Sequence, residues 1–400
     1  MIGIELEQAV ELLSNKINLI EDYEEVELEQ ALGRNLVEDF YAPIYQPPFN
    51  RSPLDGIAVR AQDTVGANTD HPKTFKIIET VFAGMASQKR LGMGEAVRIM
   101  TGAPLPEGSD AVIRQEEVVF KGEEAMVQKS VSPYSNYCYK GEDIQKGQLL
   151  IEKCTTLTAI HLGVLASMGC NKVRVRRQLR VGLMSTGDEL IKPGLPLEEG
   201  KIYNANTTLL AARLKELGMI PLILEAQQDD PDHVARKIKE MMPQLDILLT
   251  TGGVSVGQKD IMHEVILKLQ ATRLFWKVNM QPGTPILAME LGKQLILSLS
   301  GNPFAALATF ECIARPVLGK MSGQSYVYPV KAEGVLKGAF NKVSKKRRMI
   351  RGLYEEGDVT IPYEHASGVL SSMIGCNCLI DIEADTPNIL EGTNVKVIKL

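Results

Sequence analysis

The spacing of hydrophobic positions changes three times along the chain. In residues 5–20, Leu6, Val10, Leu13 and Ile17 recur at intervals of three and four, which predicts an amphipathic helix. From about residue 40 to 178, short β-branched runs are interrupted by glycine, proline and aspartate, which is typical of a β-rich region.

Within this region, residues 133–150 read as an exit loop, and residues 155–169 have a helical texture with a closing glycine. The β-rich region therefore has room for more than one subdomain.

From about residue 179 to 320 the pattern is strand, loop and helix, repeated. Strands are predicted at 179–186, 220–226, 245–250 and 294–300, and helices at 204–218, 231–242, 261–270 and 303–318. In the first of these helices, Asn206 is the expected N-cap and Gly218 the expected end. Such alternation predicts a parallel sheet covered on both faces, with ligands at the carboxyl ends of the strands. From about residue 321, short β runs predict a small separate β-domain.

Composition limits the possible partners. The 400 residues are 44% hydrophobic and 23% charged, enough for a large core in about two to four domains. The net charge of -5 gives no global field that favours nucleic acid or an anionic membrane. Because no apolar run reaches the length of a membrane span and the first residues lack a secretion signal, we expect a cytoplasmic protein without membrane or nucleic-acid partners.

The six cysteines include no CxxC pair and the five histidines are scattered, so the spacing of zinc ligands is absent and reduced structural thiols are expected. Any metal ion is expected to have oxygen ligands, which points to magnesium or calcium.

Three loops that follow predicted strands each join a small residue to glycine. They are STGDEL (185–190), TTGGVSVGQKD (250–260) and LSGNP (299–303). Glycine permits positive φ and exposes backbone amides, which suit a phosphate or another oxyanion. No GK[ST] or GxGxxG is present, and tight strand-to-helix turns remain the alternative, but three such loops at one edge favour binding.

Acidic residues accompany these glycines at the same predicted edge: Asp188, Glu189, Asp229, Asp230 and Asp260. Carboxylates around a polyanion would repel it unless a divalent cation lies between them, so magnesium is the simplest hypothesis.

Helix capping is the alternative for the same acids. Thr186 and Glu189 have the spacing of a capping box, Asp230 can cap the helix that begins at Pro231, and Asp260 can cap the helix after it. Capping and metal binding are compatible.

Positive charge comes from two further segments. Residues 275–285 place Lys277 and Gln281 near the same edge, with a solvated surface lysine as the alternative. Residues 341–352 hold six bases, which either bind phosphates or keep an edge strand from pairing; charge alone favours the edge strand.

Taken together, these motifs resemble the molybdopterin molybdenumtransferases, the MoeA family, and the related E domain of gephyrin. The matching segments, in the family's order, are 52–59, 98–117, 141–144, 185–190, 250–260, 275–283, 300–310 and 367–373.

The resemblance implies a multidomain α/β plus β fold. A doubly wound, molybdopterin-binding α/β domain is accompanied by a split helical domain, an inserted β-domain and a C-terminal β-barrel-like domain. The expected ranges are 1–50 with 140–178 for the split domain, 51–139 for the inserted domain, 179–320 for the α/β domain and 321–400 for the C-terminal domain.

The resemblance also implies an activity. Family members insert molybdate into adenylylated molybdopterin with magnesium or another divalent cation, and they release AMP. A homodimer is implied as well, together with a possible contact with the molybdopterin adenylyltransferase.

Residue roles follow from the same resemblance. Asp55, Thr101, Asp143 and Glu189 match the family's catalytic positions, with Asp143 and Glu189 organising the reacting end. Glu189 together with Asp229 and Asp260 is implied to hold magnesium. The implied substrate-binding residues, with Lys277, Arg351 and Ser367 in the oxyanion pocket, are Gly252, Gly253, Ser255, Gly257, Lys277, Gln281, Ser300, Gly301, Asn302, Arg351 and Ser367.

The chain departs from the family pattern mainly in one region. Gln281 and Thr284 stand where relatives commonly carry lysine, Ser300 where they carry proline, Ala305 where they carry serine and Gly368 where they carry histidine. Losing positive charge from a pocket for a dianion should weaken molybdate binding. A carrier or scaffold that binds molybdopterin or its adenylate, and a tungstate-inserting enzyme, are therefore the alternatives.

Overall fold

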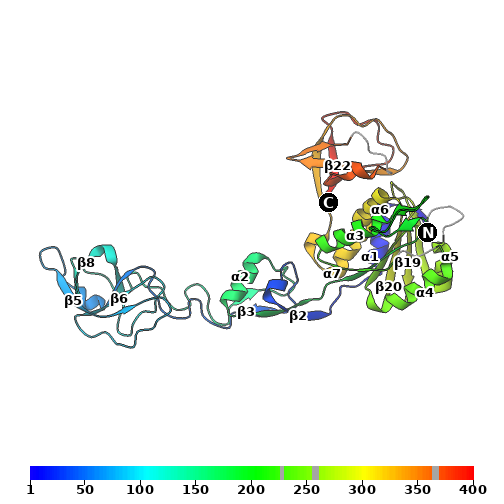
Figure 1. Ribbon diagram of the computed structural model, residues 1–400. Coiled ribbons are helices and arrows are strands. Elements are labelled where there is room, and N and C mark those ends of the chain that lie inside the picture. The colour runs from blue at the N-terminus through cyan, green and yellow to red at the C-terminus, as the bar shows by residue number, and fades with distance from the viewer. Residues whose placement is uncertain (226–228, 255–260, 363–368) are drawn as a thin grey trace. The chain divides into compact units, whose positions relative to one another are not determined.

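A computed structural model describes residues 1–225, 229–254, 261–362 and 369–400 (Figure 1). The chain forms two compact units. The first comprises residues 1–37, 156–158 and 172–400, and the second comprises residues 38–155 and 159–171. The finer four-part division stays a prediction.

A seven-stranded sheet is the centre of the first unit, in the order β1-β17-β19-β20-β16-β12-β15. Its strands are β1 (Ile2–Ile4), β12 (Arg180–Ser185), β15 (Ile220–Ile223), β16 (Ile247–Thr251), β17 (Thr272–Val278), β19 (Leu287–Leu291) and β20 (Gln294–Leu299). β19 runs antiparallel to both neighbours, so the expectation of a purely parallel sheet was wrong. Short turns on either side of β19 leave no room for the crossover that a parallel neighbour needs.

Helices cover both faces of this sheet (Figure 1). One face packs against α1 (Leu6–Ser14), α3 (Ala205–Glu216), α6 (Pro303–Thr309) and α7 (Arg315–Ser322). The other packs against α4 (Pro231–Met241) and α5 (Met262–Leu269). The doubly wound architecture is therefore confirmed.

The ends of these helices differ from the predictions in two places. α3 begins earlier than expected, because Asn204 and not Asn206 accepts the Thr207 amide as N-cap (3.2 Å). No helix follows Thr186 and Glu189, so their capping-box interpretation was wrong; short strands β13 (Leu190–Ile191) and β14 (Ile202–Tyr203) lie there instead.

Other helix predictions were closer. Asp230 caps α4 through the amides of Asp232 and His233, as expected. The predicted helix 303–318 is interrupted by a π-type turn, Phe310–Ala314, between α6 and α7. Whether Asp260 caps α5 lies outside the described residues.

A closed barrel forms the C-terminal part of the first unit. Its ring is β22-β23-β21-β25-β24, closed by pairing of β24 with β22, and β18 attaches to β22. The strands are β18 (Met280–Gln281), β21 (Val330–Lys337), β22 (Arg347–Glu355), β23 (Asp358–Thr360), β24 (Cys378–Ile382) and β25 (Asn394–Lys399).

The basic segment leads into β22, so the edge-strand interpretation was wrong. Among the described strands, β22 pairs with β18, β23 and β24, so it lies within the ring and is not an edge strand. Its charge is matched by acids: Arg347 donates to both oxygens of Asp381 (2.6 Å each).

The first unit also contains an antiparallel ribbon of β2 (Tyr23–Glu27) and β11 (Lys172–Arg176). Arg177 follows this ribbon and binds Asp246 with two hydrogen bonds (2.8 and 2.7 Å), which ties the ribbon to the α/β part. These bonds, to a nearly buried carboxylate, raise the pKa of Arg177.

The second unit is built on a six-stranded sheet in the order β7-β4-β6-β5-β9-β8. Its strands are β4 (Gly56–Val59), β5 (Lys73–Val81), β6 (Glu95–Ile99), β7 (Ala111–Arg114), β8 (Val118–Lys121) and β9 (Glu124–Val127), and the unit also holds β3 (Phe40–Tyr41), β10 (Leu149–Ile151) and α2 (Ala159–Ser167). The predicted β-rich region is thus confirmed.

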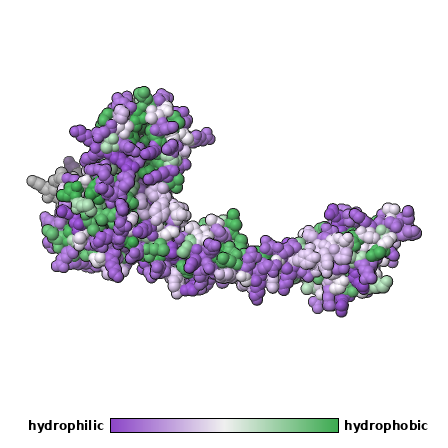
Figure 2. All heavy atoms as spheres, turned by 180° about the vertical axis from the view of Figure 1, so that it is seen from behind, coloured by the Kyte–Doolittle hydropathy of each residue, from purple (hydrophilic) through white to green (hydrophobic). Residues whose placement is uncertain are grey.

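Two observations describe how hydrophobic residues are distributed in the helices and on the surface. Among the described residues, no helix has the length and apolar character needed to cross a membrane. Hydrophilic and hydrophobic atoms are interspersed on the face shown in Figure 2.

Candidate functional site

Loops from three adjacent strands meet at the carboxyl edge of the seven-stranded sheet. Thr186 follows β12, Gly252 and Gly253 follow β16, and Gly301 follows β20. A Cβ atom on Gly252 would lie 2.3 Å from the Thr186 carbonyl oxygen, and one on Gly301 would lie 3.6 Å from Cα of Gly252. Gly252 also has φ +92°. Glycine is needed at position 252 because the backbones approach too closely for a side chain, whereas at position 301 an added Cβ atom would make an ordinary contact.

A network of hydroxyl and amide groups lies beneath these loops. Ser185 Oγ is 2.8 Å from Thr251 Oγ1 and 2.9 Å from Thr207 Oγ1. Asn206, in the first turn of α3, donates its Nδ2 to the Gly301 carbonyl oxygen at 2.7 Å. These bonds fix the loops to one another and to α3.

Two buried polar atoms at this edge have no hydrogen-bond partner among the described residues: Thr186 Oγ1 and Asn206 Oδ1. Thr186 is 3% exposed and Asn206 is 8% exposed. Because buried polar atoms are nearly always paired, these two are suited to bind a ligand held by the loops.

Acidic residues gather at the same edge. The Asp229 amide donates to Asp188 Oδ1 at 3.2 Å, which joins the loop before α4 to the loop after β12. Glu189 is exposed, and its own backbone carbonyl accepts from the Ile202 amide (2.8 Å). The carboxylates of Asp188, Glu189 and Asp229 supply the oxygen donors that magnesium prefers.

The predicted magnesium set is only partly described. Asp260 lies outside the described residues, as do Ser255 and Gly257 of the glycine loop and Ser367 of the C-terminal barrel. In the described part of the chain, no group of three or more His, Cys, Asp or Glu residues is arranged as a metal site.

Lys277 lies at the end of β17 and connects indirectly to the glycine loop. Its Nζ lies 4.0 Å from the centroid of the Trp276 ring. Trp276 Nε1 in turn donates to the Val254 carbonyl oxygen at 3.3 Å. Lys277 has φ +70°, an uncommon value for a residue with a side chain. The sequence left open that Lys277 is a fully solvated surface lysine. In the structure it is half-buried and has an uncommon backbone conformation.

Gln281 and Thr284 contact the segment that precedes β22. Ser344 Oγ donates to Gln281 Oε1 (3.4 Å), and Lys346 Nζ donates to Thr284 Oγ1 (3.3 Å). Between them, Gly283 packs on α6, where a Cβ atom would lie 2.4 Å from Thr309 Cγ2. Lys346 therefore supplies a positive charge beside Thr284.

The loop before α6 carries three predicted site residues, Ser300, Gly301 and Asn302. Asn302 caps α6 by accepting from the Ala305 amide, and Ser300 Oγ accepts from the Asn302 amide, both at 3.3 Å. Arg351 of β22 lies nearby, with its guanidinium carbon 4.3 Å from the centroid of the Phe304 ring. Burial lowers the pKa of Arg351.

Three predicted catalytic residues belong to the second unit. Asp55 Oδ1 accepts from both the amide and the hydroxyl of Thr101 (2.7 Å each), and these bonds lower the pKa of Asp55. Asp143 is exposed, and its amide donates to the Gln46 carbonyl oxygen (3.1 Å). Asp55 and Thr101, which the resemblance named separately, thus form a hydrogen-bonded pair.

Four residues with a place at the site were not among the sequence-predicted site residues. Asp188 and Asn206 were visible only as an acid in a glycine loop and as a cap. Trp276 is the sole tryptophan, which is a compositional signal. Lys346 is one of six bases in 341–352, and only the contact with Thr284 distinguishes it.

A doubly wound α/β domain with glycine loops at its strand ends, joined to a closed β-barrel, defines a class of multidomain proteins whose α/β domain has room for a ligand at that edge. Family models identify the particular family. "MoeA N-terminal region (domain I and II)" matches residues 4–169, "Probable molybdopterin binding domain" matches 182–320, and "MoeA C-terminal region (domain IV)" matches 333–400. The chain belongs to the MoeA family of molybdopterin molybdenumtransferases.

Individual relatives agree with this assignment. The chain is 38% identical over 382 residues to the molybdopterin molybdenumtransferase of Bacillus subtilis, covering 93% of this chain and 89% of the relative. It is 33% identical over 377 residues to the same enzyme of Staphylococcus epidermidis, covering 93% and 90%. The crystal structure of a molybdopterin biosynthesis MoeA protein from Pyrococcus horikoshii matches with a TM-score of 0.86 and 31% identity over 99% of both chains.

Proposed function

We propose that this chain is a molybdopterin molybdenumtransferase that inserts molybdate into adenylylated molybdopterin and releases AMP, in molybdenum cofactor biosynthesis. The observation that carries the proposal is the meeting of Thr186, Gly252 and Gly301 at one sheet edge, with unpartnered buried polar atoms beside exposed backbone. Such an edge binds the phosphate-bearing part of a substrate.

Each group at this edge has a proposed part. Gly252, Gly253, Gly301 and Asn302 bind the phosphates and pterin through backbone and amide groups. Glu189 is exposed beside them and orients the reacting end. Cleavage of a phosphoanhydride depends mainly on positioning and on neutralising charge, so side chains held in place at this edge contribute most.

The loops at this edge carry carboxylates, which are the kind of oxygen donor that magnesium prefers. Asp188 and Asp229 are joined by the 3.2 Å bond from the Asp229 amide, and Glu189 adds a third carboxylate to the same loops. We propose that Glu189, Asp229 and Asp260 hold the ion. When bound, magnesium supplies positive charge that offsets the phosphates.

The oxyanion is proposed to bind toward the barrel. Arg351 is fixed over Phe304, Lys277 is fixed over Trp276, and Ser367 is the third proposed ligand. Gln281 and Ser300 contribute polar groups. Molybdate is a dianion, so the positive charge of Arg351 and Lys277 is the main attraction.

The proposed catalytic residues of the second unit are Asp55, Thr101 and Asp143. Asp55 is a carboxylate at neutral pH and the bonds from Thr101 hold it in place and lower its pKa, which suits a group that binds a cation or orients a donor. We further propose a homodimer, a cytoplasmic location and transfer of the substrate from the molybdopterin adenylyltransferase.

The test uses purified protein with adenylylated molybdopterin, magnesium and molybdate, following AMP release and cofactor formation together. Molybdate-dependent release of AMP with equimolar cofactor supports the proposal. Tight binding of the adenylate without AMP release, with molybdate or tungstate, would overturn it.

A second candidate function rests on Gln281 and Thr284, which are uncharged where relatives commonly carry lysine. A carrier that holds the adenylate, or an enzyme that prefers tungstate, follows from a weaker oxyanion pocket. Titrating molybdate against tungstate in the same assay separates these alternatives, because a carrier responds to neither.

A further inference from the structure

A carboxylate is buried in the helix that follows the Ser300–Asn302 loop. Glu311 is 0% exposed and lies in the π-type turn between α6 and α7. Pro316 lies in the first turn of α7 and has no amide hydrogen to continue an ordinary α-helix, so a wider turn before it is accommodated at low cost. The neighbouring residues of the turn are apolar, so Glu311 requires charged partners.

Two arginines provide them. Arg213 of α3 donates its Nε to Glu311 Oε1 at 2.6 Å, and Arg315 donates its Nη1 to Glu311 Oε2 at 2.7 Å. Burial opposes the charge on Arg213, but the bonds to Glu311 raise its pKa. Arg213 also binds Glu216 (2.8 Å). The triad joins α3 to the helix pair α6 and α7.

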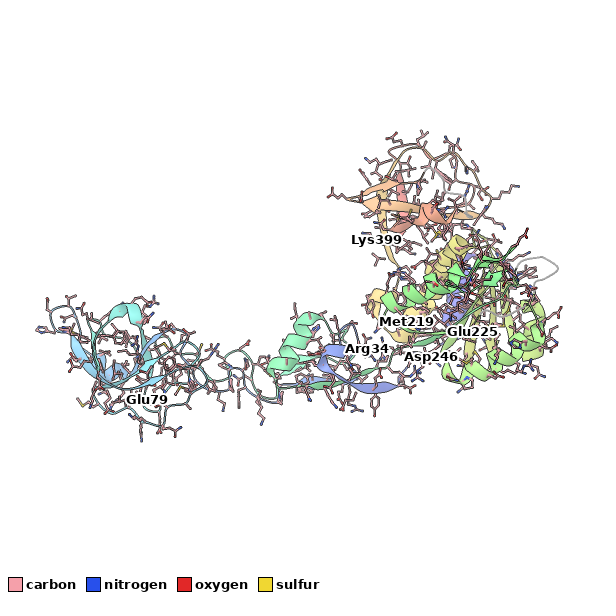
Figure 3. The ribbon with its side chains drawn as sticks, viewed as in Figure 1. Arg34, Glu79, Met219, Glu225, Asp246 and Lys399 are labelled. Carbon is pink, nitrogen blue, oxygen red and sulfur yellow. The ribbon has the colours of Figure 1, made fainter. Side chains whose placement is uncertain are left out.

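Arg315 reaches further than Glu311. Its Nε donates to the Val327 carbonyl oxygen (2.7 Å), its Nη1 to the Lys399 carbonyl oxygen (3.0 Å) and its Nη2 to the Tyr328 carbonyl oxygen (3.4 Å). Lys399, labelled in Figure 3, is the last residue of β25 in the barrel. One buried guanidinium therefore holds the barrel's last strand and the connection that leads to its first strand.

The helix pair α6 and α7 also contacts the barrel at its other end, in α6. Phe304, in the first turn of α6, lies beneath the guanidinium of Arg351. On the α3 side, Asn206 holds Gly301 at one end and Arg213 holds Glu311 at the other. The strand-end loops and the barrel are thus connected to the same two helices.

We infer that Arg315, oriented by Glu311, is a positioning residue: it holds the C-terminal barrel so that Arg351 stays against Phe304, in the turn that follows the Ser300–Asn302 loop, and thereby sets the affinity for the oxyanion. The inference rests on the proposed function for the identity of that oxyanion. Arg315 touches neither substrate nor the reacting atoms, and it acts through the carbonyl oxygen of Lys399 and the position of Arg351.

A purely structural role is the alternative, since buried ion triads are often replaceable by apolar residues without loss of stability. The decisive variant is Arg315→Lys. Lysine retains a charge for Glu311 but lacks the planar fork that reaches three carbonyl groups. The matched control is Arg213→Lys, which changes the other arm of the same triad and does not alter the three bonds from Arg315 to backbone carbonyl groups.

Two readouts are measured on the full chain. The first is the KM for molybdate and, separately, for adenylylated molybdopterin. The second is independent of activity: the alkylation rate of Cys376, resolved by mass spectrometry, with the exposed Cys154 as internal reference. Cys376 is partly buried and lines a cavity of 490 Å³ together with Arg351 and Phe304.

Arg315→Lys is expected to raise the KM for molybdate about tenfold, to leave the KM for the adenylate within about twofold, and to speed Cys376 alkylation about threefold or more. Arg213→Lys is expected to leave both KM values near wild type. Unchanged Cys376 alkylation and unchanged molybdate KM in Arg315→Lys would overturn the inference, as would an equal rise of both KM values.

Two further arms keep the test decisive. If Arg315→Lys does not melt cooperatively, Phe304→Leu removes the ring beneath Arg351 without touching the triad; it must raise the molybdate KM, and an unchanged KM refutes the inference. If wild-type protein releases no AMP, the proposed function fails, while the Cys376 comparison still tests the positioning role.

Discussion

Asn206 Nδ2 donates to the Gly301 carbonyl oxygen at 2.7 Å across 95 positions of sequence, and this bond ties the first turn of α3 to the loop that precedes α6. Both the first turn of α3 and the loop before α6 lie at the sheet edge where the glycine loops meet. The bond therefore fixes the spacing of two walls of the proposed substrate site.

Asn206→Ala removes this bond and leaves the Gly301 carbonyl without it. We expect affinity for adenylylated molybdopterin to fall about fivefold to tenfold, the effect of one hydrogen bond of about 1 kcal/mol, because the loop loses its anchor. Titration of the protein with the adenylate, followed by intrinsic fluorescence, measures the change. Asn68→Ala, at an exposed position of the second unit, is the control; equal affinities for wild type and Asn206→Ala would contradict the prediction.

Gly252→Ala tests the close approach of the loops. The added methyl group would lie 2.3 Å from a backbone oxygen at φ +92°, so we expect a loss of about 1–3 kcal/mol in the free energy of unfolding. Gly301→Ala is the matched control, since its methyl group would meet nothing closer than 3.6 Å. Urea unfolding compares the two; a smaller loss for Gly252→Ala than for Gly301→Ala would refute the predicted packing.

The hydrogen bonds of Asp55 predict how its contribution to folding stability depends on pH. Its pKa is lowered from the ordinary value of an aspartate by hydrogen bonds from the amide and then the hydroxyl of Thr101, so the folded state favours the carboxylate. This contribution to stability is present above the unfolded-state pKa and is lost as pH falls through the lower folded-state pKa. Thr101→Val removes only the hydroxyl bond, and the pKa of Asp55 should move part of the way back.

Carboxyl-carbon NMR titration of Asp55 measures this shift. Thr101→Ser retains the hydroxyl and should keep the low pKa. If Thr101→Val and wild type titrate alike, the hydroxyl does not contribute, and Thr101 must act through its backbone amide alone.

Glu189→Gln tests the proposed catalytic acid. The carboxylate is exposed at the loop and makes no side-chain contact that stabilises the fold among the described residues, so thermal unfolding should stay close to that of wild type. Turnover should fall by about a hundredfold or more, because charge at the reacting end is lost. Glu198→Gln, an exposed acid beyond β13, is the control. Near-normal AMP release by Glu189→Gln would remove it from this role.

Gln281→Lys tests the oxyanion pocket. Gln281 is exposed, and among the described residues the hydrogen bond of its side chain is to Ser344, so a lysine fits without burial of its charge. A new charge-assisted bond should tighten molybdate binding about tenfold. Thr284→Lys should do less, because Lys346 already donates to Thr284 and would repel a second cation. Isothermal titration with molybdate measures both, with Gln281→Met as control; weaker binding by Gln281→Lys would show that the pocket is arranged differently.

The sequence alone determined much of this protein. Alternating strands and helices predicted the doubly wound sheet, and glycines at three strand ends predicted loops that meet, because both signals depend on local backbone geometry and on the period of apolar residues. The motif resemblance named Asp55 and Thr101 separately, and their pairing through two hydrogen bonds is seen only in the structure.

Tertiary structure decided the rest. The charge of the basic segment 341–352 predicted an edge strand that is kept from pairing. In the structure β22 pairs with β18, β23 and β24, because closure of the ring depends on which strands pair and not on charge. The sequence predicted Asn206 as the N-cap of α3. In the structure Asn204 accepts the hydrogen bond from the Thr207 amide, and Asn206 donates to the Gly301 carbonyl oxygen instead. The role of Glu311 carries no signal in sequence, because its partner Arg213 comes from an element 98 positions earlier and the Lys399 carbonyl bound by its other partner, Arg315, lies 84 positions after Arg315.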